Sequence, residues 1–101
     1  MAEATPTVTA DTADVRVTTW TFAAGAHTGV HRHEYDYVVV PVTGGTFTVT
    51  GADGRVTTMQ QVAGAAYLGV SGTVHDVANA TDGPVSFVEV ELRRPVQHSG
   101  R

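Results

Sequence analysis

Two histidines separated by a single residue, His31 and His33, are the feature of this chain best suited to chemistry, and a third, His75, follows much later. In an extended strand alternate side chains face the same side, so the backbones of His31 and His33 would lie roughly 6–7 Å apart with both imidazoles projecting together. Two imidazoles at that spacing can converge on one ion or one small ligand. A histidine on a neighbouring strand would complete one face of a coordination sphere. The spacing therefore points to an ion- or ligand-binding site.

Strands must position these residues, because apolar residues recur with period two or in short blocks and almost never with helical spacing. Valine, threonine, tyrosine and phenylalanine, which favour strands, are abundant. We expect strands at 15–23, 30–42 (broken or bent near Pro41), 46–50, 55–59, a short stretch containing Tyr67, 75–78 and 85–92, and no helix of useful length. About eight short strands at regular spacing predict an all-β fold, a small antiparallel jelly-roll barrel, with an open sandwich as the alternative.

Length and composition limit the classes of function. The 101 residues predict one domain, with an ordered core of about 8–93 between a short flexible N-terminus and a C-terminal tail. The six basic residues are all arginine and form no cluster, which disfavours nucleic-acid binding, and the absence of lysine and cysteine excludes Schiff-base and thiol chemistry. The first residues lack the regions of a signal peptide and no apolar run could span a membrane, so we expect a cytoplasmic protein without membrane contacts.

Two gapped motifs resemble those of the cupins. The first cupin motif places glycine, His-X-His, glutamate and glycine in order, and Gly25, His31-Arg-His33, Tyr37 and Gly44 have that spacing here. The second motif places two glycines, a histidine and an asparagine in order, which Gly64, Gly72, His75 and Asn79 match, with Val70 where proline is usual. The resemblance covers about half of the chain and implies a single cupin domain over 1–101.

In cupins the motif histidines and the glutamate usually bind one divalent metal, so the resemblance implies that His31, His33 and His75 are metal ligands. Tyr37 replaces the glutamate. A metal held by neutral imidazoles alone keeps its full charge, which strengthens it as a Lewis acid. Three nitrogens with open positions suit Fe, Zn, Mn, Ni or Cu, and the sequence does not choose between these metals.

Other residues near the motifs have less specific expectations. Tyr37 is a candidate catalytic residue that donates a hydrogen bond or proton to substrate, or else it packs its ring in the barrel. Asn79 is expected to have a structural role, His27 to be an exposed loop histidine, and Asp76 to be a solvated charge facing outward. The candidate lining of a substrate pocket is Tyr35, Tyr67 and Met59, with core packing as the alternative.

Three functions follow from this resemblance. The first is a metal-dependent enzyme, with dioxygenase-like or Lewis-acid chemistry on a small oxygenated organic compound. The others are a non-catalytic module that binds a small ligand, and a metal-free isomerase or dehydratase that uses histidine and tyrosine as acid and base. Cupins commonly pair, so a homodimer is also implied.

Overall fold

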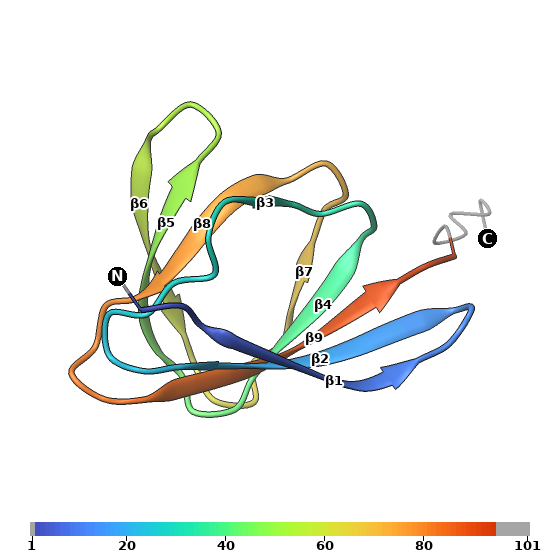
Figure 1. Cartoon of the computed structure of the whole chain (residues 1–101), viewed down its shortest axis with the longest axis horizontal. Helices are drawn as coiled ribbons and strands as arrows, with labels where there is room; N and C mark the ends of the chain where they lie inside the picture. Colours follow the sequence, from blue (N-terminus) through green and yellow to red (C-terminus); the bar gives the residue numbers. More distant parts are fainter. Residues whose placement is uncertain (1, 95–101) are drawn as a thin grey trace.

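The computed structural model describes residues 2–94 and consists of nine β-strands in two facing antiparallel sheets (Figure 1). The larger sheet has the order β1-β2-β9-β4-β7 and the smaller sheet the order β3-β8-β5-β6. The strands are β1 (Thr5–Asp11), β2 (Val15–Phe22), β3 (His31–Arg32), β4 (Tyr37–Pro41), β5 (Gly45–Gly51), β6 (Val56–Gln61), β7 (Tyr67–Gly69), β8 (Val74–Asn79) and β9 (Val85–Leu92). The all-β jelly-roll prediction is confirmed. Within residues 2–94, no helix is long and apolar enough to cross a membrane.

The expected strands match the observed ones except in two places. The prediction of one strand over 30–42, broken or bent near Pro41, is wrong. This stretch forms two strands, β3 and β4, which belong to different sheets. The chain leaves β3 after Arg32 and crosses to the larger sheet, and Asp36 Oδ1 in this crossing accepts a hydrogen bond from the Ser71 amide (2.8 Å). In addition, β1 was not among the expected strands. The predicted C-terminal tail falls mostly at 95–101, outside the described residues.

Aromatic packing closes one end of the space between the sheets. Phe22 and Phe87 of the larger sheet meet Phe47 of the smaller one, with ring centroids 5.3–5.7 Å apart. Asn79 has the expected structural role at this end. Its buried side-chain amide donates hydrogen bonds to the carbonyls of Ala23 and Gly83 at 3.1 and 2.8 Å. Large buried aromatic surfaces supply much of the stabilising energy of so small a core.

The opposite end stays open because the inward positions there carry polar side chains. Along β9 the inward residues run Val85, Phe87, Glu89 and Glu91, from the apolar core toward the opening. On β8 the same change runs from Val77 to His75. The fold therefore presents polar side chains inside an otherwise apolar sandwich, next to the predicted site.

Candidate metal centre

The pairing of β3 with β8 brings the three predicted histidines together. His31 lies directly opposite His75 in the antiparallel register. The pairing continues beyond β3, because the His33 amide donates to the Thr73 carbonyl (2.8 Å) and the Gly72 amide donates to the His33 carbonyl (2.7 Å). His31 and His33 therefore stay in phase on one face, as alternate residues of an extended chain do.

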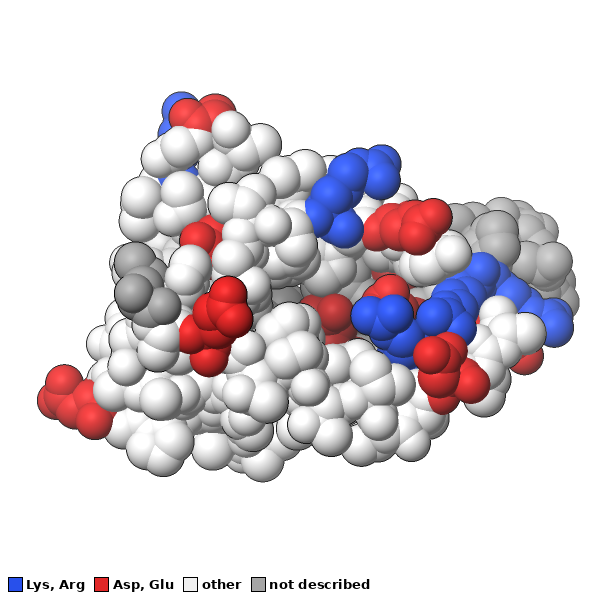
Figure 2. All heavy atoms as spheres, in the orientation of Figure 1, with Lys and Arg blue, Asp and Glu red and all other residues white. Residues whose placement is uncertain are grey.

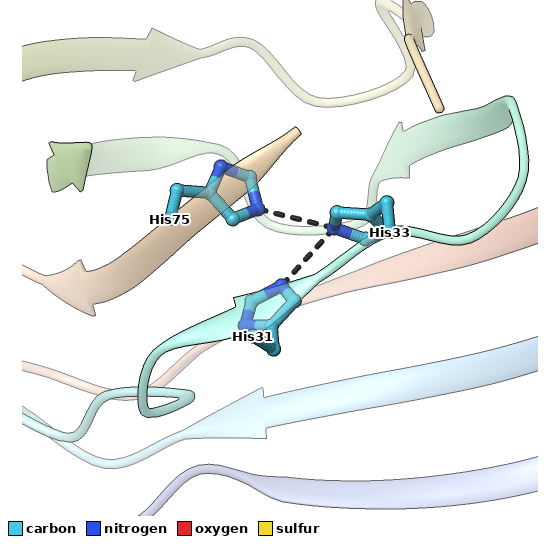
Figure 3. A group of neighbouring side chains, drawn as sticks. All are labelled: His31, His33 and His75. Atoms are coloured by element: carbon cyan, nitrogen blue, oxygen red, sulfur yellow. Dashed lines mark hydrogen bonds between the residues drawn. The ribbon is translucent and has the colours of Figure 1, made fainter. Parts of the chain in front are cut away.

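The three imidazoles point toward one another (Figure 3). The Nε2 atom of His33 lies 3.0 Å from Nε2 of His31 and 3.1 Å from Nε2 of His75. Within residues 2–94, these three form a group whose ligand atoms could hold one metal ion. Two nitrogens bound to one ion at about 2.1 Å lie roughly 3.0 Å apart at a right angle and roughly 3.4 Å apart at the tetrahedral angle. The measured separations fit a shared ion.

Burial keeps two of these imidazoles neutral. Desolvation, reinforced by the neighbouring His31 and His75, lowers the pKa of His33 from 6.5 to about 4. Desolvation and His31 likewise lower the pKa of His75 to about 4. A neutral imidazole can offer its lone pair to a metal, whereas a protonated one cannot. At neutral pH these two residues are in the form that metal binding requires.

A backbone carbonyl sets the tautomer of His31. The Nδ1 atom of His31 lies 2.9 Å from the carbonyl oxygen of Gly29. Because a carbonyl only accepts hydrogen bonds, Nδ1 must carry the proton, which leaves the Nε2 lone pair of the neutral ring facing His33. This is the orientation that metal ligation by Nε2 needs.

Tyr37, the residue at the usual glutamate position, covers one face of His33. Its ring stacks on the imidazole with centroids 3.8 Å apart and planes at 16°. The Tyr37 side chain is buried, and desolvation, with Glu89 adding to it, raises its pKa to about 12. The phenol therefore keeps its proton at neutral pH.

Glu89 on β9 is a candidate site residue that the sequence analysis did not single out. It is 8% exposed, and its Oε1 lies 4.0 Å from Nδ1 of His33. Burial, then repulsion from Glu91, raises the pKa of Glu89 from 4.5 to about 7, and Arg16 opposes this rise. A signal for it exists in the sequence, since Glu89 is in phase with the apolar Val85 and Phe87 on one strand.

A cavity of about 180 Å³ adjoins the histidines. Tyr67 and Met59, two of the three residues expected at a substrate pocket, line this cavity together with His31, His75, Tyr37 and Glu89. The Gln61 side-chain amide donates to the Tyr67 hydroxyl at 2.9 Å, which fixes one wall. Tyr35, the remaining predicted lining residue, lies in the bend between β3 and β4 and is not among the described residues that line this cavity.

A second, more polar hollow of about 300 Å³ shares four residues with the first, Trp20, Thr28, His31 and Glu89. Figure 2 shows side chains of both charge signs gathered around the opening between the sheets. The charged residues lining this hollow are Arg16, Arg32, Glu34, Glu89 and Glu91. A bound molecule would thus meet an apolar wall on one side and polar groups on the other.

Comparison with known proteins agrees with this geometry. A family model described as the cupin domain matches residues 18–91. The chain belongs to the cupin family. This cupin is 48% identical over 91 residues to the "Beta-alanine degradation protein BauB" of Pseudomonas aeruginosa, covering 90% of this chain and 95% of that protein.

Solved structures confirm the cupin fold. A cupin domain from Bordetella pertussis Tohama I superposes with a TM-score of 0.88 at 41% identity, covering 92% of this chain and 96% of that one. An uncharacterised protein with a double-stranded β-helix domain from Klebsiella pneumoniae gives a TM-score of 0.75 at 25% identity, covering 90% of this cupin and 77% of that chain.

Proposed function

We propose that this cupin is an enzyme that binds one divalent transition metal through His31, His33 and His75 and acts on a small oxygenated organic compound. The observation that carries the proposal is the convergence of three imidazole Nε2 atoms, with neighbouring separations of 3.0 and 3.1 Å, beside a cavity. A metal held in this way supplies open coordination positions for Lewis-acid or dioxygenase-like redox chemistry. With three neutral nitrogen ligands it would keep its full double charge.

The cavity limits the size and character of the substrate. Its volume of about 180 Å³ lies below the roughly 300–1,000 Å³ typical of pockets for drug-sized ligands. Its wall is mainly apolar and aromatic, whereas the adjoining hollow carries two arginines, Arg16 and Arg32, and three glutamates. A compound with a short carbon skeleton and at least one oxygen group matches both parts.

Two residues of the cavity wall hold protons in complementary ways. Tyr37 keeps the proton on its Oη at neutral pH, so the hydroxyl can donate a hydrogen bond to substrate but is a poor base. With its pKa raised to about 7, the Glu89 carboxyl is populated in both forms at neutral pH, which suits a group that takes up and returns a proton. These roles would add acid–base chemistry beside the metal.

The relative from Pseudomonas aeruginosa supports a role in the chemistry of small metabolites, because its name refers to the degradation of β-alanine. We propose that the substrates of this cupin belong to the same class of compound, namely short carboxylic acids and their oxidised derivatives. The proposal also places the protein in the cytoplasm, which cell fractionation with a specific antibody would check.

Turnover after metal exchange tests the enzyme proposal. Protein reconstituted separately with Fe²⁺, Mn²⁺, Zn²⁺, Ni²⁺ and Cu²⁺ is incubated with three-carbon acids, aldehydes and keto acids related to β-alanine, while oxygen uptake and substrate loss are followed. We expect one metal to support turnover that stops on chelation and returns with that metal. The His31→Ala, His33→Ala double variant should bind no metal and be inactive.

The other outcomes favour the other functions. Turnover that survives complete chelation but is lost in Glu89→Gln would favour metal-free acid–base catalysis, for which the carboxyl in the cavity wall is the specific support. Saturable binding of one compound without turnover under any metal would favour a non-catalytic binding module.

We also propose that two copies pair through the outer face of the larger sheet. Residues in register across this face include Val17, Val90, Val38 and Leu68 in one row and Thr19, Val88 and Val40 in the next. The inward side of the sheet carries Arg16, Glu89 and Glu91, whereas the outward positions of β2, β4, β7 and β9 carry no charge. The outer face of the smaller sheet differs, since Arg32 and Asp76 lie on it.

The size of this face supports a second copy as the occupant. Five strands spaced about 4.8 Å apart, with the longest about 26 Å in length, project roughly 500 Å², and side-chain relief enlarges the accessible area. A standard interface buries about 800 Å² per partner. Light scattering should therefore report a dimer that Val90→Lys converts to a monomer, whereas Val56→Lys, an exposed valine on β6 with 61% exposure, should leave it intact. A monomeric wild-type protein would refute the pairing.

A further inference from the structure

Asp76 follows His75 on β8 but points to the other side of the strand, away from the three imidazoles. Instead of the solvated charge expected from the sequence, its carboxylate lies 3.0 Å from Nδ1 of His27 through both oxygens. The Asp76 Oδ1 atom also accepts a hydrogen bond from the Gly29 amide at 3.1 Å. Both side chains are only 23% exposed, so His27 is not the exposed loop histidine that was expected.

These contacts fix the loop that precedes the first ligand. The Thr28 amide donates to the Val77 carbonyl (2.9 Å), and the Val77 amide donates to the Thr28 hydroxyl oxygen (3.1 Å), so Thr28 binds the loop to β8 through both its backbone and its side chain. Gly29 then turns the chain with a φ of 82°, which is unfavourable for residues with a side chain. Asp76 holds the amide of this turn.

The carbonyl of the same glycine receives the Nδ1 proton of His31, at 2.9 Å. Asp76 on one strand and the ring of His31 on the next are thus connected through the two backbone polar groups of one residue. Partners that orient a ligating histidine fix its tautomer and ring direction, and their loss typically weakens metal binding about 10–100-fold.

We propose that Asp76 and His27 are positioning residues for His31: they lock the 27–29 loop so that the Gly29 carbonyl holds the His31 ring with Nδ1 protonated and Nε2 directed at the other two imidazoles. The inference rests on the proposed metal site and adds to it residues that touch neither metal nor substrate. It assigns a role to a half-buried histidine–carboxylate contact that the ligand set alone leaves unexplained.

The test uses the metal-free full-length protein and two readouts. Side-chain ¹⁵N shifts report the tautomer of His31 without any metal, and competition with a chromogenic chelator gives the dissociation constant for Zn²⁺. We expect Asp76→Ala to mix the His31 tautomers and to raise the Zn²⁺ dissociation constant about tenfold, the lower end of the usual range because the effect passes through the backbone. The control Asp82→Ala, which removes an exposed carboxylate, should change neither readout.

A milder variant, His27→Gln, keeps the test available if Asp76→Ala does not fold, as judged by its thermal transition. It should shift both readouts in the same direction by a smaller amount. Folded Asp76→Ala or His27→Gln protein with wild-type tautomer and wild-type Zn²⁺ affinity would overturn the inference. Failure of the wild-type protein to bind Zn²⁺ or any other transition metal would instead overturn the proposed metal site, while the tautomer shift still decides the positioning role.

Discussion

Gly69 on β7 is the position where one added methyl group should disturb the site most. It pairs with Tyr37 across the β4–β7 ladder, and the Tyr37 ring lies flat over it. A Cβ built on Gly69 would be pressed against the face of the ring, in impossible contact with Cζ, Cε1 and Cε2. Because the other face of this ring stacks on His33, the ring cannot move away freely. Alanine at position 69 should therefore displace Tyr37.

The expected cost follows from three contributions. Overpacking costs about 1–3 kcal/mol, and loss of the ring stack about 0.5–1.5 kcal/mol. Replacing glycine in a strand returns about 0.5–1 kcal/mol through the unfolded chain. We expect Gly69→Ala to lower the free energy of unfolding by about 2 kcal/mol, which corresponds to roughly 10 °C in the melting temperature of a domain of this size.

Urea unfolding of the metal-free protein, followed by the fluorescence of its single tryptophan, measures this change. Gly83→Ala is the matched control, because a Cβ there meets nothing within 4 Å, and it should stay within about 0.5 kcal/mol of wild type. In the double variant Gly69→Ala, Tyr37→Val the clash has no partner, so the two changes should be coupled by at least about 1 kcal/mol. A Gly69→Ala variant as stable as the control, or an additive double variant, would refute the packing described for Tyr37.

Three further outcomes are expected. In the unfolded chain His33 and His75 are protonated near pH 6.5, whereas in the folded metal-free protein they are protonated only near pH 4. The free energy of unfolding should therefore fall as the pH drops from about 6.5 to 4. Unfolding curves of Glu89→Gln protein that do not change between pH 7 and 4.5 would contradict this. Because its pKa is raised to about 7, Glu89 lowers the stability of the wild-type fold as the pH rises from about 4.5 to 7. Glu89→Gln should therefore gain stability relative to wild type as the pH rises from 5 to 8. A difference in the free energy of unfolding that stays constant with pH would argue against a buried carboxyl. Tyr37→Phe keeps the stack but removes the hydroxyl, so Zn²⁺ affinity should be unchanged while turnover falls about 100-fold, and full turnover would leave Tyr37 a packing role.

The sequence was sufficient to predict the three histidines as a group, because strand alternation and the two gapped motifs depend only on spacing. Alternation along a single strand over 30–42 would also put Tyr37 on the face of the histidines. The structure does not support that reason, because His33 pairs with the smaller sheet and Tyr37 lies on the larger one. The phase survives the crossing only because both sheets face the same interior.

What the sequence did not reveal depends on contacts between distant strands. The clash that reserves position 69 for glycine arises from the pairing of β4 with β7, and the bond of Asp76 to the 27–29 loop arises from residues 47 and 49 positions apart. Glu89 could have been found from its phase with Phe87, but a carboxylate at an inward position becomes meaningful only when His33 is known to lie opposite it. Strand β1 could not be predicted from apolar alternation, because every residue in it is exposed.

X-ray absorption spectroscopy at the edge of the metal that co-purifies with untagged protein would show whether three imidazoles share one ion. We expect about one metal per chain with three imidazole nitrogens at roughly 2.1 Å, and loss of that signal in the His31→Ala, His33→Ala double variant. A metal-free protein that takes up no transition metal on reconstitution, or a bound metal without imidazole scattering, would contradict it.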